Sequence, residues 1–151
     1  MSRDQDIYYM QKAVQLATQA AFLKEVPVGA VLVLEDRVIG EGHNASISLC
    51  DPTAHAEMMA LRHAAKAVGN YRLLNTTLYV TLEPCMMCAG ALVHARISRL
   101  VYAAQDPKAG VVITKATLLH QPFLNHEIKC EGGILAEQCG TLLSQFFANK
   151  R

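Results

Sequence analysis

Apolar residues recur at steps of three and four near the start of the chain, which predicts an amphipathic helix over residues 4–24 with Asp4 as its cap. The pattern then changes to two short segments, 28–34 and 37–43, separated by the polar pair Glu35-Asp36. This change predicts a β-hairpin whose first, more apolar arm is a central strand of a sheet. The apolar stripe of the helix comprises Ile7, Met10, Val14, Ala17 and Ala21.

Helical and extended patterns continue to alternate along the rest of the chain. Alternation of this kind predicts an α/β layer sandwich, in which crossover helices make some strands parallel. The expected segments are a helix from about 55 to a stop at Gly69, a strand at 77–82, a helix at 86–96 with Pro84 in its first turn, a strand at 99–103, a loop at 105–116 and a last helix at 135–149.

The 151 residues, 52% of them hydrophobic, suit one domain over 1–151, because no linker divides them. No apolar run approaches the roughly 20 residues of a membrane span, and the polar start of the chain lacks a signal-peptide pattern. We therefore expect a cytoplasmic protein with no membrane partner. The net charge of +1 gives no general attraction to a polyanion, so a nucleic acid would need a local patch or the surface of two joined subunits.

The chain has five cysteines, which in a reducing compartment are metal ligands or buried thiols rather than disulfides. Cys50, Cys130 and Cys139 have no motif partner, and we expect each to be a small buried side chain. Cys85 and Cys88 differ, because they are one turn apart at the start of a predicted helix. The positive end of a helix favours thiolates, which are the form that binds metal.

His55, Cys85 and Cys88 together predict a catalytic zinc site. They supply one imidazole and two thiols, and His55 also lies at the start of a predicted helix. Three protein ligands leave the fourth tetrahedral position for a water, which zinc would activate as a nucleophile. This donor set is typical of a hydrolytic deaminase.

Glu57 is the predicted proton shuttle of this site. It would take a proton from the attacking water, pass it to a ring nitrogen of the substrate and help to protonate the departing amine. Side chains two residues apart in a regular helix point to nearly opposite sides. His55 and Glu57 can therefore share a pocket only if the first turn of their helix is irregular.

The Cys-x-x-Cys pair has three other interpretations besides a catalytic site. A thioredoxin-like redox helix also carries this pair after a strand, but it does not explain His55 and Glu57. A structural zinc would need a fourth ligand, and the nearest candidate, His94, faces away from both thiols on one helix. A zincin protease would need a second histidine at position 59, where this chain has Met59.

The motif H-x-E followed by P-C-x-x-C resembles the signature of the zinc nucleobase deaminases. The stretches Pro27–Ala30, Asp51–Glu57 and Leu82–Ala91 and the last helix together resemble the bacterial tRNA-specific adenosine deaminases over nearly the whole chain. The resemblance implies a cytidine deaminase-like fold, a three-layer α/β/α sandwich with a mixed five-stranded sheet. It also implies a homodimer with one Zn²⁺ per subunit, which converts the wobble adenosine of an arginine tRNA anticodon to inosine.

The same resemblance implies a set of substrate-binding residues. Each also has a plainer interpretation: the asparagine as a loop cap, the Asp106 loop as an ordinary turn, and the C-terminal residues as core and helix-end charges. The chain departs from its relatives at Val111, where they have a smaller residue, and at Lys150, where they favour arginine. The implied residues are Asn44 at the target nucleotide, Asp106 and Lys108 near the RNA backbone, and Phe147, Lys150 and Arg151 around the anticodon loop, while Phe146 is expected in the core.

Two functions of other classes remain as alternatives. A deaminase of free bases or nucleosides would use the same zinc chemistry without a basic surface. A non-catalytic partner subunit could keep the zinc for stability, but such a chain has no need of Glu57.

Overall fold

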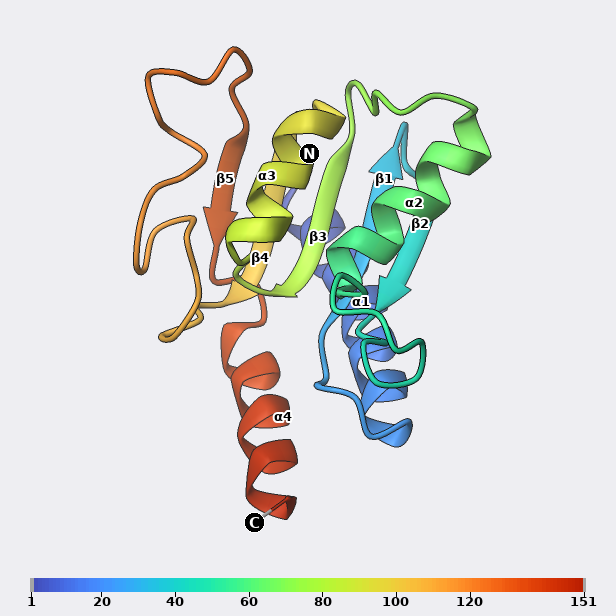
Figure 1. Ribbon diagram of the computed structural model, residues 1–151, viewed down its shortest axis with the longest axis vertical. Helices are drawn as coiled ribbons and strands as arrows, with labels where there is room; N and C mark the ends of the chain where they lie inside the picture. The colour runs from blue at the N-terminus through green and yellow to red at the C-terminus, as the bar shows by residue number, and fades with distance from the viewer. Residues whose placement is uncertain (1, 151) are drawn as a thin grey trace.

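Five strands form one mixed sheet in the order β2-β1-β3-β4-β5 (Figure 1). β1 pairs antiparallel with both β2 and β3, whereas β3, β4 and β5 run parallel to one another. In the computed structural model, which describes residues 2–150, the strands are β1 (Gly29–Leu34), β2 (Arg37–His43), β3 (Thr77–Leu82), β4 (Arg99–Ala104) and β5 (Lys129–Gly132).

Two helices cover each face of this sheet, which confirms the expected three-layer α/β/α sandwich (Figure 1). Helices α2 (Ala56–Val68) and α3 (Met86–Ala95) pack small and aliphatic side chains on one face. Helices α1 (Arg3–Phe22) and α4 (Ala136–Asn149) lie on the other, where Tyr9, Met10 and Cys139 join the core. Each face thus has its own apolar core cluster, so both surfaces of the central strands are buried.

Helix α1 begins earlier than its apolar stripe suggests. Its cap is Ser2 rather than Asp4: the Ser2 side chain accepts the N–H of Gln5, and the Gln5 side chain accepts the N–H of Ser2. This reciprocal pair is a capping box, which satisfies two helix-end N–H groups at once. The prediction of Asp4 as the cap was therefore wrong by two residues.

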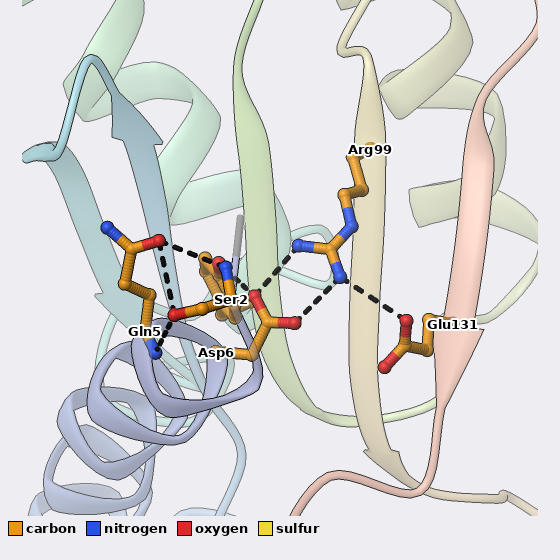
Figure 2. A network of polar contacts seen from close by, with 6 residues as sticks. Ser2, Gln5, Asp6, Arg99 and Glu131 are labelled. Carbon is orange, nitrogen blue, oxygen red and sulfur yellow. Dashed lines mark hydrogen bonds and ion pairs between the residues drawn. The ribbon is translucent and has the colours of Figure 1, made fainter.

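A charged network joins helix α1 to strands β4 and β5 (Figure 2). Asp6, only 3% exposed, accepts hydrogen bonds from both terminal nitrogens of Arg99 on β4, at 2.8 and 2.7 Å, and from the hydroxyl of Tyr79 at 2.7 Å. Arg99 also pairs with Glu131 on β5 at 3.3 Å. The network fixes α1 against three strands, and it lies among residues that the apolar pattern had not singled out.

The carboxyl ends of β2, β3 and β4 lie at the same edge of the sheet. β2 and β3 are both antiparallel to β1, and β3 is parallel to β4. At this edge the N–H of Gly29 donates to the Thr81 hydroxyl at 3.2 Å, so the start of β1 lies beside the carboxyl end of β3. Segments that follow these three strands are therefore neighbours, as is usual for binding sites of α/β sheets.

Several sequence-based expectations differ from the structure. The fifth strand, β5, was not located by its pattern, and Pro84 lies before the helix cap rather than in the first turn of α3. Cys139 is buried as expected, but Cys50 is exposed in a loop. Phe146 is only partly buried on α4, which extends past the sheet (Figure 1). Across residues 2–150, none of the helices combines the length and the apolar character needed to span a bilayer.

Candidate metal centre and substrate site

His55 and Cys85 each occupy the cap position of a helix. The backbone of His55 is extended before α2, with φ −79° and ψ 156°, and that of Cys85 is extended before α3, with φ −83° and ψ 177°. Cys88 follows in the first turn of α3 and is fully buried. Three potential ligands thus gather at the positive ends of two helices, where negative sulfur is stabilised.

The spacing of these ligand atoms suits zinc. Nδ1 of His55 lies 3.6 Å from the sulfur of Cys85 and 3.6 Å from that of Cys88. A tetrahedral zinc with ordinary bond lengths requires a nitrogen-to-sulfur separation of about 3.6 Å. Among residues 2–150 this is the one cluster of three or more potential ligands, and His94 is not part of it.

The carboxyl group of Glu57 is buried next to this cluster, with 4% of the residue exposed. Its position explains how His55 and Glu57 share a pocket, because His55 is an extended cap residue and only Glu57 lies in the helix. Burial raises the pKa of Glu57 to about 7. Hydrogen bonds from Cys88 and then His55 lower the pKa of the Cys85 thiol to about 3, which favours its thiolate form.

Asn44 directly follows β2 at the sheet edge that carries the metal ligands. Its side-chain oxygen Oδ1 accepts the N–H of Ala56, the first residue of α2, at 2.8 Å. The plainer interpretation of Asn44, a capping residue, is therefore correct for the oxygen. Within residues 2–150 no acceptor is found for its Nδ2 amide group, which remains a donor at the site.

Glu83 is a site residue that the sequence analysis missed. It follows β3, two residues before Cys85, and is 2% exposed. Its carboxylate accepts backbone N–H groups from the loop that follows β4. The donors are Asp106 at 3.1 Å, Val112 at 3.0 Å, Ile113 at 2.9 Å and Thr114 at 3.0 Å, and the Thr114 hydroxyl donates as well.

Asp106 and Lys108 lie in this same loop. The Asp106 carboxylate accepts the N–H groups of Lys108 at 2.9 Å and Ala109 at 3.2 Å, so it caps its own turn. Lys108 instead lines a surface hollow of about 550 Å³ with residues at the end of α4, among them Phe147 and the C-cap residue Lys150. The structure thus brings three of the predicted substrate residues together, whereas Asp106 has a local structural role.

The end of α4 carries exposed aromatic and basic groups. Phe147 is 46% exposed and packs edge to face against Phe146, over whose ring the Lys150 ammonium lies at 5.0 Å. An exposed ring beside lysines is suited to stacking a base near its phosphate. Arg151, predicted to share this role, lies outside the described residues.

Glu25 is a second buried glutamate that the sequence analysis missed. It is 2% exposed and accepts the N–H of Ile47 at 3.2 Å, together with the N–H and hydroxyl of Ser48 at 2.6 and 2.7 Å. It holds the loop between Asn44 and His55 in shape. In the sequence Glu25 lies between Lys24 and Val26, and Glu83 lies between Leu82 and Pro84, so no shared local pattern indicated either position.

Comparison with known proteins agrees with this geometry. Residues 3–104 match the family model described as the cytidine and deoxycytidylate deaminase zinc-binding region. The tRNA-specific adenosine deaminase of Haemophilus influenzae is 53% identical over 94% of this chain and 83% of its own. That of Bacillus subtilis is 45% identical over 97% of this chain and 91% of its own.

Solved structures give the same picture. A tRNA:A34 deaminase studied for A-to-I editing at the wobble position is 44% identical, covers 90% of this chain and 99% of its own, and superposes with a TM-score of 0.87. The guanine deaminase of Nitrosomonas europaea superposes with a TM-score of 0.79 over 94% of this chain and 84% of its own. At 22% identity, the latter similarity concerns the fold alone.

Proposed function

Because this chain belongs to the family of tRNA-specific adenosine deaminases, we propose that it hydrolyses the wobble adenosine of an arginine tRNA anticodon to inosine and ammonia. The observation that carries the proposal is the complete set of one imidazole, two thiols and a buried carboxyl group in a single site. Relatives that align with nearly the whole chain are named tRNA-specific adenosine deaminases. The family resemblance alone supports the choice of an arginine tRNA.

The residues of the site would have two different roles in the reaction. His55, Cys85 and Cys88 would hold one zinc per subunit, which when bound supplies a Lewis acid that makes water more acidic. Glu57 would accept a proton from the attacking water, deliver it to a ring nitrogen of adenine and return a proton to the leaving amine. Its burial beside the ligands supports this role and argues against a non-catalytic subunit.

Binding of the anticodon loop would use the remaining site residues. The Nδ2 group of Asn44 would donate to the target nucleotide, since the Asn44 oxygen already accepts the N–H of Ala56. The hollow between Lys108, Phe147 and Lys150 would take a neighbouring base by stacking, with the ammonium groups near phosphate. We expect Arg151 to add a further cation there.

We also propose that the enzyme is a cytoplasmic homodimer of single-domain subunits. Several large apolar side chains are exposed at α2, α3 and the segment between α2 and β3, where a second copy could cover them. Sedimentation of the zinc-loaded protein should give twice the subunit mass, and Met86→Glu should shift it toward the monomer. These side chains are Val68, Tyr71, Leu74 and Met86.

The test compares two transcripts of an arginine tRNA, one with the anticodon ACG and one with GCG, together with free guanine and cytidine. Inosine would be read as an A-to-G change on reverse transcription, and ammonia would be measured in parallel. We expect inosine only at position 34 of the ACG transcript. Ammonia from guanine or cytidine with unmodified tRNA would overturn the substrate and favour the free-base deaminases, whose fold this chain shares.

A further inference from the structure

We propose that Glu83 is a positioning residue that holds the loop of residues 106–114 in the shape needed to bind tRNA. The inference rests on the proposed function, because it assigns a role to that loop in substrate binding. Glu83 itself is buried, with 2% of the residue exposed. It acts through the loop that it anchors.

The hydrogen bonds of Glu83 span the whole loop. One carboxylate oxygen, Oε1, accepts from Asp106 at the start of the loop, and the other, Oε2, accepts three consecutive N–H groups from Val112 to Thr114 at its end. The loop also donates from Val111 to the carbonyl oxygen of Pro84 at 3.1 Å. Four backbone N–H groups from the two ends of the loop thus converge on one side chain.

Gly110 shows how closely the loop is fitted around this carboxylate. A Cβ atom at position 110 would lie 2.4 Å from Oε1 of Glu83, which is far inside van der Waals contact. Only glycine allows the backbone to approach Glu83 this closely. The loop therefore depends on two residues, one that supplies the acceptors and one that leaves room for them.

The loop connects Glu83 to the surface that would meet RNA. The Asp106 N–H binds Glu83, the Asp106 carboxylate binds the N–H of Lys108, and Lys108 lines the hollow that it shares with Phe147 and Lys150. Glu83 also lies two residues before the ligand Cys85. The same short segment thus places a metal ligand on one side and the lysine-bearing loop on the other.

The experiment uses the full-length, zinc-loaded Glu83→Gln protein. The amide of glutamine retains one acceptor oxygen but turns an NH₂ group toward N–H donors, so one end of the loop loses its partner. We expect amide hydrogen exchange at Asp106 and Val112–Thr114 to accelerate by about tenfold or more, because each lost bond is to a charged acceptor. The KM for tRNA should rise by about tenfold while kcat stays within about threefold and zinc content is unchanged.

Two controls separate this role from a general loss of stability. Glu25→Gln makes the same chemical change at the other buried glutamate, and it should accelerate exchange at Ile47 and Ser48 but not at Val112–Thr114. Gly110→Ala keeps the carboxylate and displaces the loop, so it should reproduce both the faster exchange and the higher KM. Gly110→Ala also tests the proposal if the Glu83→Gln protein does not fold.

The outcomes are distinct. Unchanged exchange at Val112–Thr114 in a folded Glu83→Gln protein would overturn the proposal, and so would faster exchange with an unchanged KM. Faster exchange together with a higher KM supports it. If the wild-type protein leaves tRNA unmodified, the proposed function fails, while faster exchange in the variant still supports Glu83 as the anchor of the loop.

Discussion

The side-chain oxygen of Asn44 accepts the backbone N–H of Ala56 at 2.8 Å, one residue after the metal ligand His55. This bond ties the end of β2 to the start of α2. It leaves the Nδ2 group of Asn44 as a donor without a partner among the described residues. We therefore expect Asn44 to recognise the nucleotide mainly by donating to an acceptor on the base or the sugar.

Replacement of Asn44 by aspartate separates these two roles. Asn44→Asp keeps an oxygen for the Ala56 N–H but removes the donor, so kcat/KM for tRNA should fall by about 10- to 100-fold with stability nearly unchanged. Asn44→Ala removes both, and urea unfolding should show a further loss of about 1 kcal/mol in the free energy of unfolding. An Asn44→Asp enzyme as active as the wild type would show that the amide donor does not bind substrate.

Replacement of Glu57 by glutamine tests the proton shuttle. Glutamine keeps the shape of the side chain but cannot carry a proton, so turnover should fall by at least about 10²-fold. Metal analysis should still find one zinc per subunit, because Glu57 is not among the three ligands. An active Glu57→Gln enzyme would refute the assignment, and loss of zinc would show that the residue serves the metal instead.

The predictable part of the fold was the part governed by local periodicity. Helices α2 and α3 and strands β3 and β4 follow from their apolar spacing, and each was located to within a residue or two. β5 was not, because its sequence Lys-Cys-Glu-Gly has no apolar alternation: three of its four residues are exposed, and Cys130 is only partly buried. That strand exists because β4 offers a parallel edge to pair with, which no local pattern reveals.

The same distinction holds at the site. His55, Cys85 and Cys88 could be predicted because metal ligands can be identified by their residue type and spacing. Glu83 could not, because its donors are backbone N–H groups that any residue supplies, 23 to 31 positions away in the chain. Glu25 was missed for the same reason. Contacts between one carboxylate and a distant backbone follow from the tertiary fold and have no sequence signature.

The Glu25 loop should loosen in acid. Burial alone would raise the pKa of Glu25, but hydrogen bonds from Ser48 and Ile47, with nearby His43, outweigh it and hold that pKa below 4.5. The stabilisation is therefore fully present above pH 4.5 and is lost as the pH falls through the lower pKa of the folded protein. Exchange at Ile47 and Ser48, corrected for the intrinsic rate, should accelerate only in that acidic range.

Glu25→Gln is the matched control for this pH dependence. Glutamine does not titrate, so exchange at Ile47 and Ser48 in this variant should be faster at neutral pH and should show no additional acid step. An acid step of the same size in Glu25→Gln would assign the pH dependence to another group.

The network around Asp6 offers a test of stability that is independent of the active site (Figure 2). Arg99→Met removes both guanidinium bonds and leaves the Asp6 carboxylate buried, with Tyr79 as a remaining donor. A buried charge without its partner is costly, so urea unfolding should show a loss of about 3–5 kcal/mol. Adding Asp6→Asn to Arg99→Met should restore part of this loss, because asparagine carries no charge.

Glu131 provides the comparison within the same network. Its side chain is 50% exposed, and its ion pair with Arg99 is therefore screened by water. Glu131→Gln should cost less than about 1 kcal/mol. If Glu131→Gln destabilised the protein as much as Arg99→Met, the contribution of Arg99 would come from the surface pair with β5, and the buried pair that joins α1 to β4 would not be what holds that helix in place.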